Sequence, residues 1–106
     1  MSLLENRQVY EAAISLLGKY FNNEAYYRHY ALNIRSSRKC IKISLRQFAL
    51  NILNEMALEP DGITLERIMK IIAIIIIPSL WKAGFSVRRI NSRHARYIIC
   101  RGPKAP

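Results

Sequence analysis

The sequence predicts a mainly helical single domain with a small antiparallel β-hairpin, and three observations support this fold class. The chain has 106 residues, of which 51% are apolar, and a chain of this length can bury one modest core. Apolar residues recur at helical spacing as far as Ala83, and from Phe85 the spacing changes to the alternation of a β-strand. Gly and Pro number only four each, which excludes a disordered or linker-type chain.

Two helices are expected at the N-terminal end. Ser2 and Glu5 form a capping box followed by apolar residues three and four apart, so the sequence predicts a helix over residues 3–20. The two asparagines at 22–23 provide a break and a new N-cap. A second helix then extends to about Ile34, and its tyrosines have the spacing of a core or dimer face, with base stacking as the alternative. These tyrosines are Tyr26, Tyr27 and Tyr30.

A short strand and a third helix follow. Residues 40–43 are β-prone, with alternate side chains on opposite faces. Ser44 and Gln47 make a second capping box, and apolar residues three and four apart predict a helix over 45–57. Residues 59–62, Glu-Pro-Asp-Gly, are typical of a turn.

A long helix is expected from Thr64, its N-cap, until Pro78 ends or kinks it. A short helical turn closed by Gly84 follows. The uncharged run 71–81 is too short to cross a membrane, since a spanning helix needs about 20 apolar residues. It is therefore expected to be a buried helix, with Trp81 in the core or an interface.

A hairpin closes the chain. Residues 85–90 alternate apolar and polar, residues 95–100 are rich in β-formers, and a polar turn separates them. The predicted order is helix, helix, short strand, helix, turn, long helix and hairpin.

The chain is strongly basic, and its charge is unevenly distributed. It has 17 Lys and Arg against 7 Asp and Glu, a formal charge of +10, and residues 25–54 and 67–106 contain no acidic residue. A surface of one sign attracts polyanions, and nucleic acid is the commonest polyanion in a cell. The alternative interpretation is a basic but inert solvated surface.

This order resembles the winged helix-turn-helix family, in which a short strand precedes two helices and a two-stranded wing follows the second helix. Residues 41–49 carry the strand and first motif helix, residues 84–90 and 96–99 carry the wing, and the resemblance covers about residues 39–101. It implies that the short strand lies antiparallel beside the last wing strand.

The domain organisation follows from the same resemblance. We expect a single winged-helix-like domain over residues 1–101, with the winged-helix core at 39–101. The extra N-terminal helices at 1–36 have no role in that core, so they are the expected dimer face. Residues 102–106 are expected to be a flexible tail.

The resemblance also implies a nucleic-acid interface. The start of the Thr64 helix would enter the major groove, where Arg67 can bridge guanine O6 and N7, and the wing would contact a minor groove or phosphates. The candidate contacts are Thr64, Arg67, Lys70, Arg88, Arg89, Arg93, His94 and Arg96, and the candidate backbone contacts are Arg38, Lys39 and Arg46. The alternative for each is an ordinary solvated side chain.

The implied pairing of strands brings Cys40 near Cys100, which makes a disulfide conceivable if their Cα atoms lie within about 7 Å. Free thiols are the alternative in a reducing cytosol, and a bridge is more credible in a hyperthermophile.

The sequence supports no enzyme, metal site or cofactor. His29 and His94 lie in different elements without a carboxylate or cysteine at ligand spacing, and no glycine-rich phosphate loop is present. No signal peptide is recognisable, so the expected location is cytoplasmic, associated with a nucleoid or, for a viral protein, inside the host cell.

The leading hypothesis is a small transcription regulator that binds duplex DNA as a homodimer. No interaction with a membrane is expected. One alternative is a structural RNA-binding protein, ribosomal or viral. Another is a virus-encoded protein-interaction module that uses the Ile-rich helix and Trp81.

Overall fold

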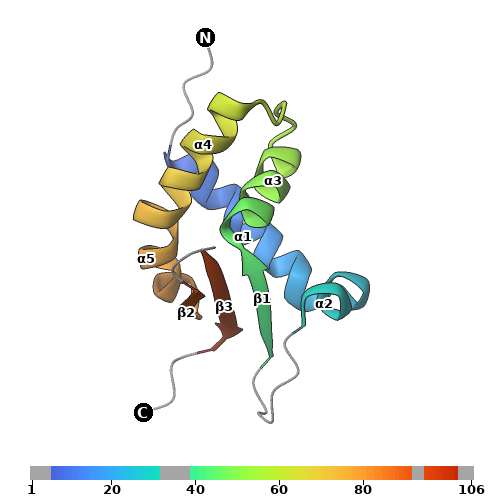
Figure 1. The fold of residues 1–106 in the computed structure, drawn as a ribbon. Helices are drawn as coiled ribbons and strands as arrows, with labels where there is room; N and C mark the ends of the chain where they lie inside the picture. Colours follow the sequence, from blue (N-terminus) through green and yellow to red (C-terminus); the bar gives the residue numbers. More distant parts are fainter. Residues whose placement is uncertain (1–5, 32–38, 92–94, 103–106) are drawn as a thin grey trace.

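In the computed structural model, residues 6–31, 39–91 and 95–102 are described, and they form a layer of helices packed on a three-stranded antiparallel sheet (Figure 1). The elements are α1 (Asn6–Asn22), α2 (Glu24–Tyr30), β1 (Cys40–Ser44), α3 (Leu45–Glu55), α4 (Gly62–Ile71), the π-helical turn η1 (Ile72–Ile76), α5 (Ile77–Ser79), the 3-10 turn η2 (Leu80–Ala83), β2 (Phe85–Asn91) and β3 (Arg96–Arg101). The prediction of a mainly helical domain with a small antiparallel β-structure is confirmed.

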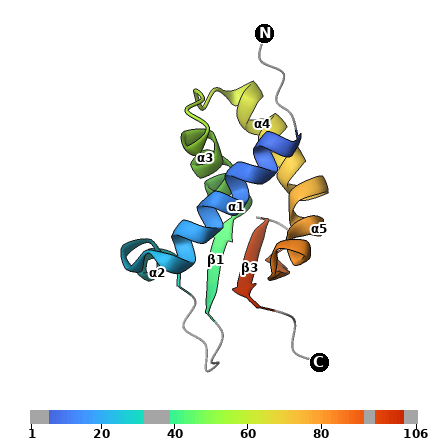
Figure 2. The same ribbon diagram turned by 180° about the vertical axis from the view of Figure 1, so that it is seen from behind.

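The core lies where α1, α3 and α4 meet above the sheet. Figure 2 shows α1 running diagonally across the helical layer, with α3 on one side and α4 on the other. The largest fully buried side chains come from all of these elements: Leu17, Tyr20, Ile41, Phe48, Ile52, Leu53, Ile68, Ile72, Ile76, Leu80 and Ile99. Removing this apolar surface from water is the main stabilising contribution to the fold. None of the described helices is long and apolar enough to span a membrane.

The sheet has the strand order β1-β3-β2, and every neighbouring pair is antiparallel. The implied position of the short strand beside the last strand of the hairpin is therefore confirmed. Ile41 lies opposite Ile99, which also lies opposite Val87, and this row faces the helices. Cys40 lies opposite Cys100, and their sulfur atoms form a disulfide with an S–S distance of 2.01 Å.

The second helix is shorter than predicted. Asn23 is its N-cap, as expected, and its Oδ1 accepts the Ala25 and Tyr26 amides at 3.0 and 3.3 Å. The helix ends at Tyr30, because Ala31 takes an extended conformation and forms a bridge with Ile41. The predicted continuation is therefore wrong at Ala31, and its remaining part lies outside the described residues, as does the predicted capping box of the first helix.

The third helix starts where predicted. The Ser44 Oγ accepts the Gln47 amide at 3.0 Å, which is one half of the expected capping box. The Gln47 side chain instead donates to the Asn51 Oδ1 at 2.9 Å. The helix ends at Glu55, two residues before the predicted Ala57, which has a φ of 56° and so cannot continue a right-handed helix.

The fourth helix has a different cap from the one predicted. Asp61, and not Thr64, is the N-cap, and its carboxylate accepts the Thr64 amide at 2.8 Å and the Thr64 hydroxyl at 2.9 Å. These hydrogen bonds, led by the one from the Thr64 amide, hold the pKa of Asp61 below its ordinary value. The prediction failed because two good capping residues stand three positions apart, and the carboxylate of the first can accept from the second.

The helix passes Pro78 without ending. It widens into η1, in which the Ile77 amide donates to the Ile72 carbonyl, five residues back. A proline clashes with the carbonyl four residues before it, and a π turn relieves such conflicts by changing the hydrogen-bond spacing. Gly84, with a φ of 88°, closes the helical stretch as predicted.

The Ile-rich stretch is only partly buried. Ile72 and Ile76 have no exposed surface, whereas Ile74 is 71% exposed. Trp81 is 69% exposed and so is not a core residue. The expectation of a buried helix therefore holds for one side of η1 and not for the other.

Candidate nucleic-acid interface

The first part of the candidate interface is the outer side of α4. Leu65 and Ile68 point into the core, so Arg67 and Lys70, on the opposite side of the same helix, are exposed. Thr64 is half-buried and its hydroxyl is bonded to Asp61. Two of the three predicted contacts on this helix are therefore open to a ligand, and Thr64 is occupied by the helix cap.

The second part is the hairpin. Arg88 lies opposite Ile98 and Arg96 lies opposite Ser44, so both side chains belong to the outer face of the sheet. Arg89 lies opposite Tyr97, on the face toward the helices, and is nevertheless exposed. An irregularity in the register between residues 89 and 91 follows it. The described hairpin arginines therefore lie on both faces of the sheet: Arg88 and Arg96 on the outer face, and Arg89 on the face toward the helices.

Of the remaining predicted contacts, only Arg46 and Lys39 are among the described residues. Arg93 and His94 of the wing and Arg38 lie outside the described residues. Arg46 is exposed in the first turn of α3. The Lys39 Nζ lies 5.1 Å from the centre of the Tyr27 ring, a distance that allows a cation–π contact.

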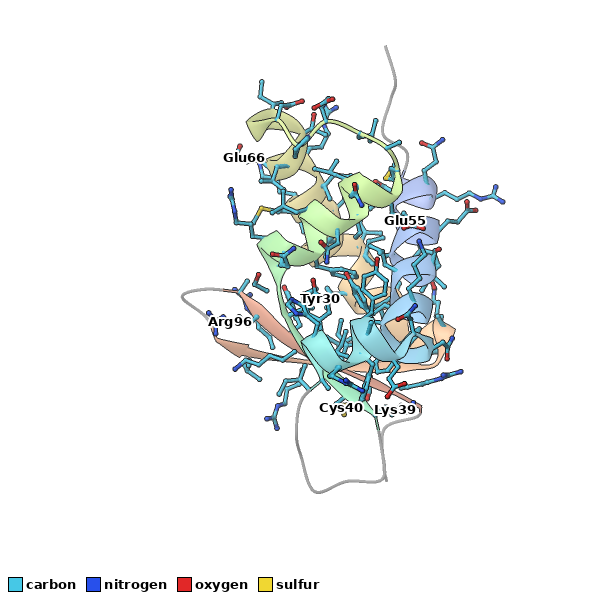
Figure 3. All side chains as sticks on the ribbon, turned by 90° about the vertical axis from the view of Figure 1, so that its right-hand side faces the viewer. Tyr30, Lys39, Cys40, Glu55, Glu66 and Arg96 are labelled. Carbon is cyan, nitrogen blue, oxygen red and sulfur yellow. A yellow bond between two sulfur atoms is a disulfide. The ribbon has the colours of Figure 1, made fainter. Side chains whose placement is uncertain are left out.

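One labelled residue of α4 and one of the hairpin lie toward the same side of the molecule. Figure 3 places Glu66 of α4 and Arg96 of β3 toward the same side, whereas Glu55 and Lys39 lie toward the other. Because Glu66 neighbours Arg67 on α4, the outer side of this helix carries both signs of charge. The hairpin contributes only basic charge among its described residues.

The described basic residues of α4 and of the hairpin take part in no ion pair. Every ion pair among the described residues involves an acid of α1, α2 or α3: Arg7 with Glu11 at 3.2 Å, Arg28 with Glu24 at 2.8 Å, and Lys19 with Glu55 at 2.7 Å. The hydrogen bond from Lys19 holds the pKa of the Glu55 carboxyl below its ordinary value. Within the described ranges, the cations of α4 and of the hairpin form no ion pair, so their charge is not neutralised locally.

The sequence prediction missed Lys42. This residue lies opposite Ile98 in β1, so it shares the outer face of the sheet with Arg88 and Arg96. The alternation of residues 40–43 already put Lys42 on the face opposite the apolar side chains. Its proximity to the hairpin depends on the pairing of β1 with β3, which the residue pattern alone does not give.

The described residues form no candidate metal site. They contain no group of three or more His, Cys, Asp or Glu residues that could hold a metal ion, and both cysteines are in the disulfide. What the arrangement offers is a basic surface for an extended anion. The chain matches no protein-family model, and no curated protein or solved structure is significantly similar to it.

Proposed function

We propose that this protein binds duplex DNA and regulates transcription by occupying its site. In this proposal α4 enters the major groove, and the hairpin contacts the phosphate backbone. The observation that carries the proposal is that the exposed cations of α4 and the hairpin form no ion pair with any described residue. Arg67, Lys70, Arg88 and Arg96 are exposed, and no acid pairs with them among the described residues. Unpaired cations favour binding to the phosphates of DNA, because each cation–phosphate contact releases condensed counterions.

The order of elements supports a helix-in-groove geometry. A short strand, two helices and a hairpin that pairs with that strand support the proposed winged-helix arrangement. The outer side of α4 is free of the core contacts that occupy Leu65 and Ile68. Arg67 would read a base, and Arg88 and Arg96 would contact phosphates, which position the protein without reading sequence.

We also propose that the protein is a homodimer, and of the two N-terminal helices only α2 remains as the expected dimer surface. The apolar face of α1 is buried in its own core, so it is not available to a second copy. Within the described N-terminal helices, the large exposed apolar side chain is Tyr26, which is 47% exposed. We expect a dimer to use α2. Light scattering at tens of micromolar protein tests this, and a monomer mass contradicts the dimer.

The experiment for DNA binding is a fluorescence-anisotropy titration of labelled duplex DNA and of structured RNA at several salt concentrations. Raising the salt from about 50 to 200 mM should weaken phosphate-dominated binding steeply. Arg67→Ala and Arg96→Ala should each weaken binding. Arg7→Ala is the matched control, because it removes the same charge from α1, where Arg7 pairs with Glu11. It should bind like the wild type.

Each result has a definite meaning. Preference for duplex DNA with loss in the Arg67 variant supports the proposal. Preference for structured RNA moves the function to RNA binding. Equal weakening by all three variants would mean that only the total charge matters and would contradict a specific interface.

A second candidate is a protein-interaction module, which the exposed apolar residues of α4, η1 and η2 favour. Ile63 is 82%, Ile74 is 71% and Trp81 is 69% exposed, and a partner that covers them would bury this apolar surface. A complex on this surface should survive high salt, whereas a phosphate-dominated complex should not.

A further inference from the structure

A polar hollow of about 490 Å³ lies at the Ser44 end of β1, between the sheet, α2 and the start of α3. Its principal lining residues are His29, Tyr30, Lys42, Ser44, Gln47 and Arg96. They come from α2, from the consecutive elements β1 and α3, and from β3 near the other end of the chain. Figure 3 labels Tyr30 and Arg96, which lie below the first turn of α3. None of its described lining residues carries a carboxylate.

The strand register brings the two cations to the same point. Arg96 lies directly opposite Ser44, and Lys42 is two residues before Ser44, so all three share one face of the sheet. Diagonal neighbours of this kind are about 7–8 Å apart, which long side chains can span. Neither cation is in an ion pair with any described residue. A ligand that bridges them must therefore be an anion.

The walls of the hollow are held by hydrogen bonds. The Gln47 Nε2 donates to the Asn51 Oδ1 at 2.9 Å, and the Asn51 Nδ2 donates to the hydroxyls of Tyr20 and Tyr30 at 2.7 and 3.0 Å. Asn51 thereby ties α3 to α1 and α2. Because the Tyr30 oxygen is the acceptor in this contact, its own O–H remains a donor for a bound oxygen.

The start of α3 adds a favourable field. The Ser44 Oγ accepts the Gln47 amide and the Leu45 amide donates to the Ala95 carbonyl at 2.8 Å, so the first turn is anchored beside the hollow. The N-terminal end of a helix carries partial positive charge that favours anions. This effect supplements the two cations and does not define the site by itself.

We propose that this hollow is a phosphate-binding pocket in which Lys42 and Arg96 hold one phosphate group. A phosphate has several acceptor oxygens in a tetrahedral arrangement, which suits a guanidinium, an ammonium and a hydroxyl that converge from different sides. The inference rests on the proposed function only for the source of the phosphate, which we assign to the backbone of the bound nucleic acid. The pocket would then fix the register of the duplex from outside the groove-reading helix.

The first test uses inorganic phosphate and does not need nucleic acid. Amide resonances of the ¹⁵N-labelled protein are followed as millimolar phosphate is added at neutral pH. We expect saturable shifts confined to Lys42, Ser44, Gln47 and Arg96. Lys42→Ala should weaken the apparent affinity about five- to tenfold, because it removes a charge-assisted contact. Lys42→Arg should retain most of the affinity, and Arg7→Ala should retain all of it.

The second test asks where the phosphate comes from. If the pocket holds a backbone phosphate, Lys42→Ala should weaken duplex binding and lower the slope of log K against log salt by about 0.9. If duplex binding by this variant is unchanged while its phosphate shifts are lost, the pocket serves a free phosphate compound, and the backbone assignment is wrong.

Two results would overturn the pocket itself. One is the absence of phosphate-induced shifts at these amides, even in a protein that binds DNA. The other is shifts that persist unchanged in both Lys42→Ala and Arg96→Ala, which would indicate general association with the basic surface. Failure to bind any nucleic acid would remove the proposed function and leave the phosphate titration to decide the pocket.

Discussion

Reduction of the Cys40–Cys100 disulfide should lower the thermal stability of this protein by a large and calculable amount. The bridge joins residues that are 60 positions apart in the sequence, and the closed loop contains α3, α4 and β2. In the chain-entropy model, closing a loop of this length stabilises the folded state by about 4 kcal/mol through restriction of the unfolded chain. For a domain of about 100 residues this corresponds to a fall of about 15–30 °C in the melting temperature.

The assay is thermal unfolding followed by circular dichroism, with and without a phosphine reductant. Alkylation under non-reducing conditions followed by mass spectrometry first establishes whether the bridge is present in the native protein. A variant with Cys40→Ala and Cys100→Ala is the control, because the reductant should not change its melting temperature. It also separates loss of the cross-link from loss of packing, since Cys40 is only 1% exposed.

Two results would refute this reasoning. Two alkylated thiols in the native protein would show that the bridge does not form. Equal melting temperatures for the oxidised and reduced wild type would show that the bridge forms but does not restrict the unfolded chain.

Two further predictions concern stability. Glu55→Gln should destabilise the protein at neutral pH and have no effect in strong acid. The hydrogen bond from Lys19 lowers the pKa of the Glu55 carboxyl in the folded protein. The ionised carboxyl therefore stabilises the fold above its unfolded pKa, and this contribution is lost as the pH falls through its folded pKa. Urea unfolding at several pH values measures this, and a difference independent of pH would argue against it. Ile68→Ala should lower the free energy of unfolding by about 2–5 kcal/mol, since Ile68 is fully buried. Ile63→Ala on the same helix should change it by less than about 0.5 kcal/mol, since Ile63 is 82% exposed, and comparable losses in the two variants would contradict the orientation of α4.

The parts of the fold that local chemistry determines were predictable from the sequence. Ser44 and Asn23 cap the helices that they were expected to cap, because a side-chain oxygen before a helical apolar pattern is a local signal. Gly84 ends its helix because only a residue tolerant of positive φ fits there. The change of period at Phe85 located the hairpin.

The errors have non-local or competing causes. Helix α2 stops at Tyr30 because Ala31 pairs with Ile41, a residue ten positions later that no local pattern connects to it. Asp61 displaced Thr64 as a cap because both residues can serve and the carboxylate accepts twice. Proline could have ended the helix, kinked it or been accommodated by a π turn. The outcome depends on how the surrounding packing lets the backbone carbonyls before Pro78 shift, and the spacing of residues does not give that.

The candidate site was predictable in its charge and less so in its geometry. Arg67 and Lys70 follow from helical spacing alone, because Leu65 and Ile68 fix the buried side of α4. The pocket was not anticipated: the implied pairing of the strands brings Ser44 beside Arg96, but the position of α2 beside β1 depends on the contact of Ala31 with Ile41, which no local pattern gives.

The strand order has a consequence for how copies of this protein behave in solution. Among the described strands β2 has β3 on one side only, so it is an edge strand, the kind of strand to which a strand of another molecule can add. Arg88 and Arg89 stand on this edge strand, and two adjacent positive charges discourage such pairing. Replacing them with alanine removes a protection against aggregation together with two candidate phosphate contacts. Any loss of binding in these variants must therefore be measured on material shown to be free of fibrils and higher oligomers.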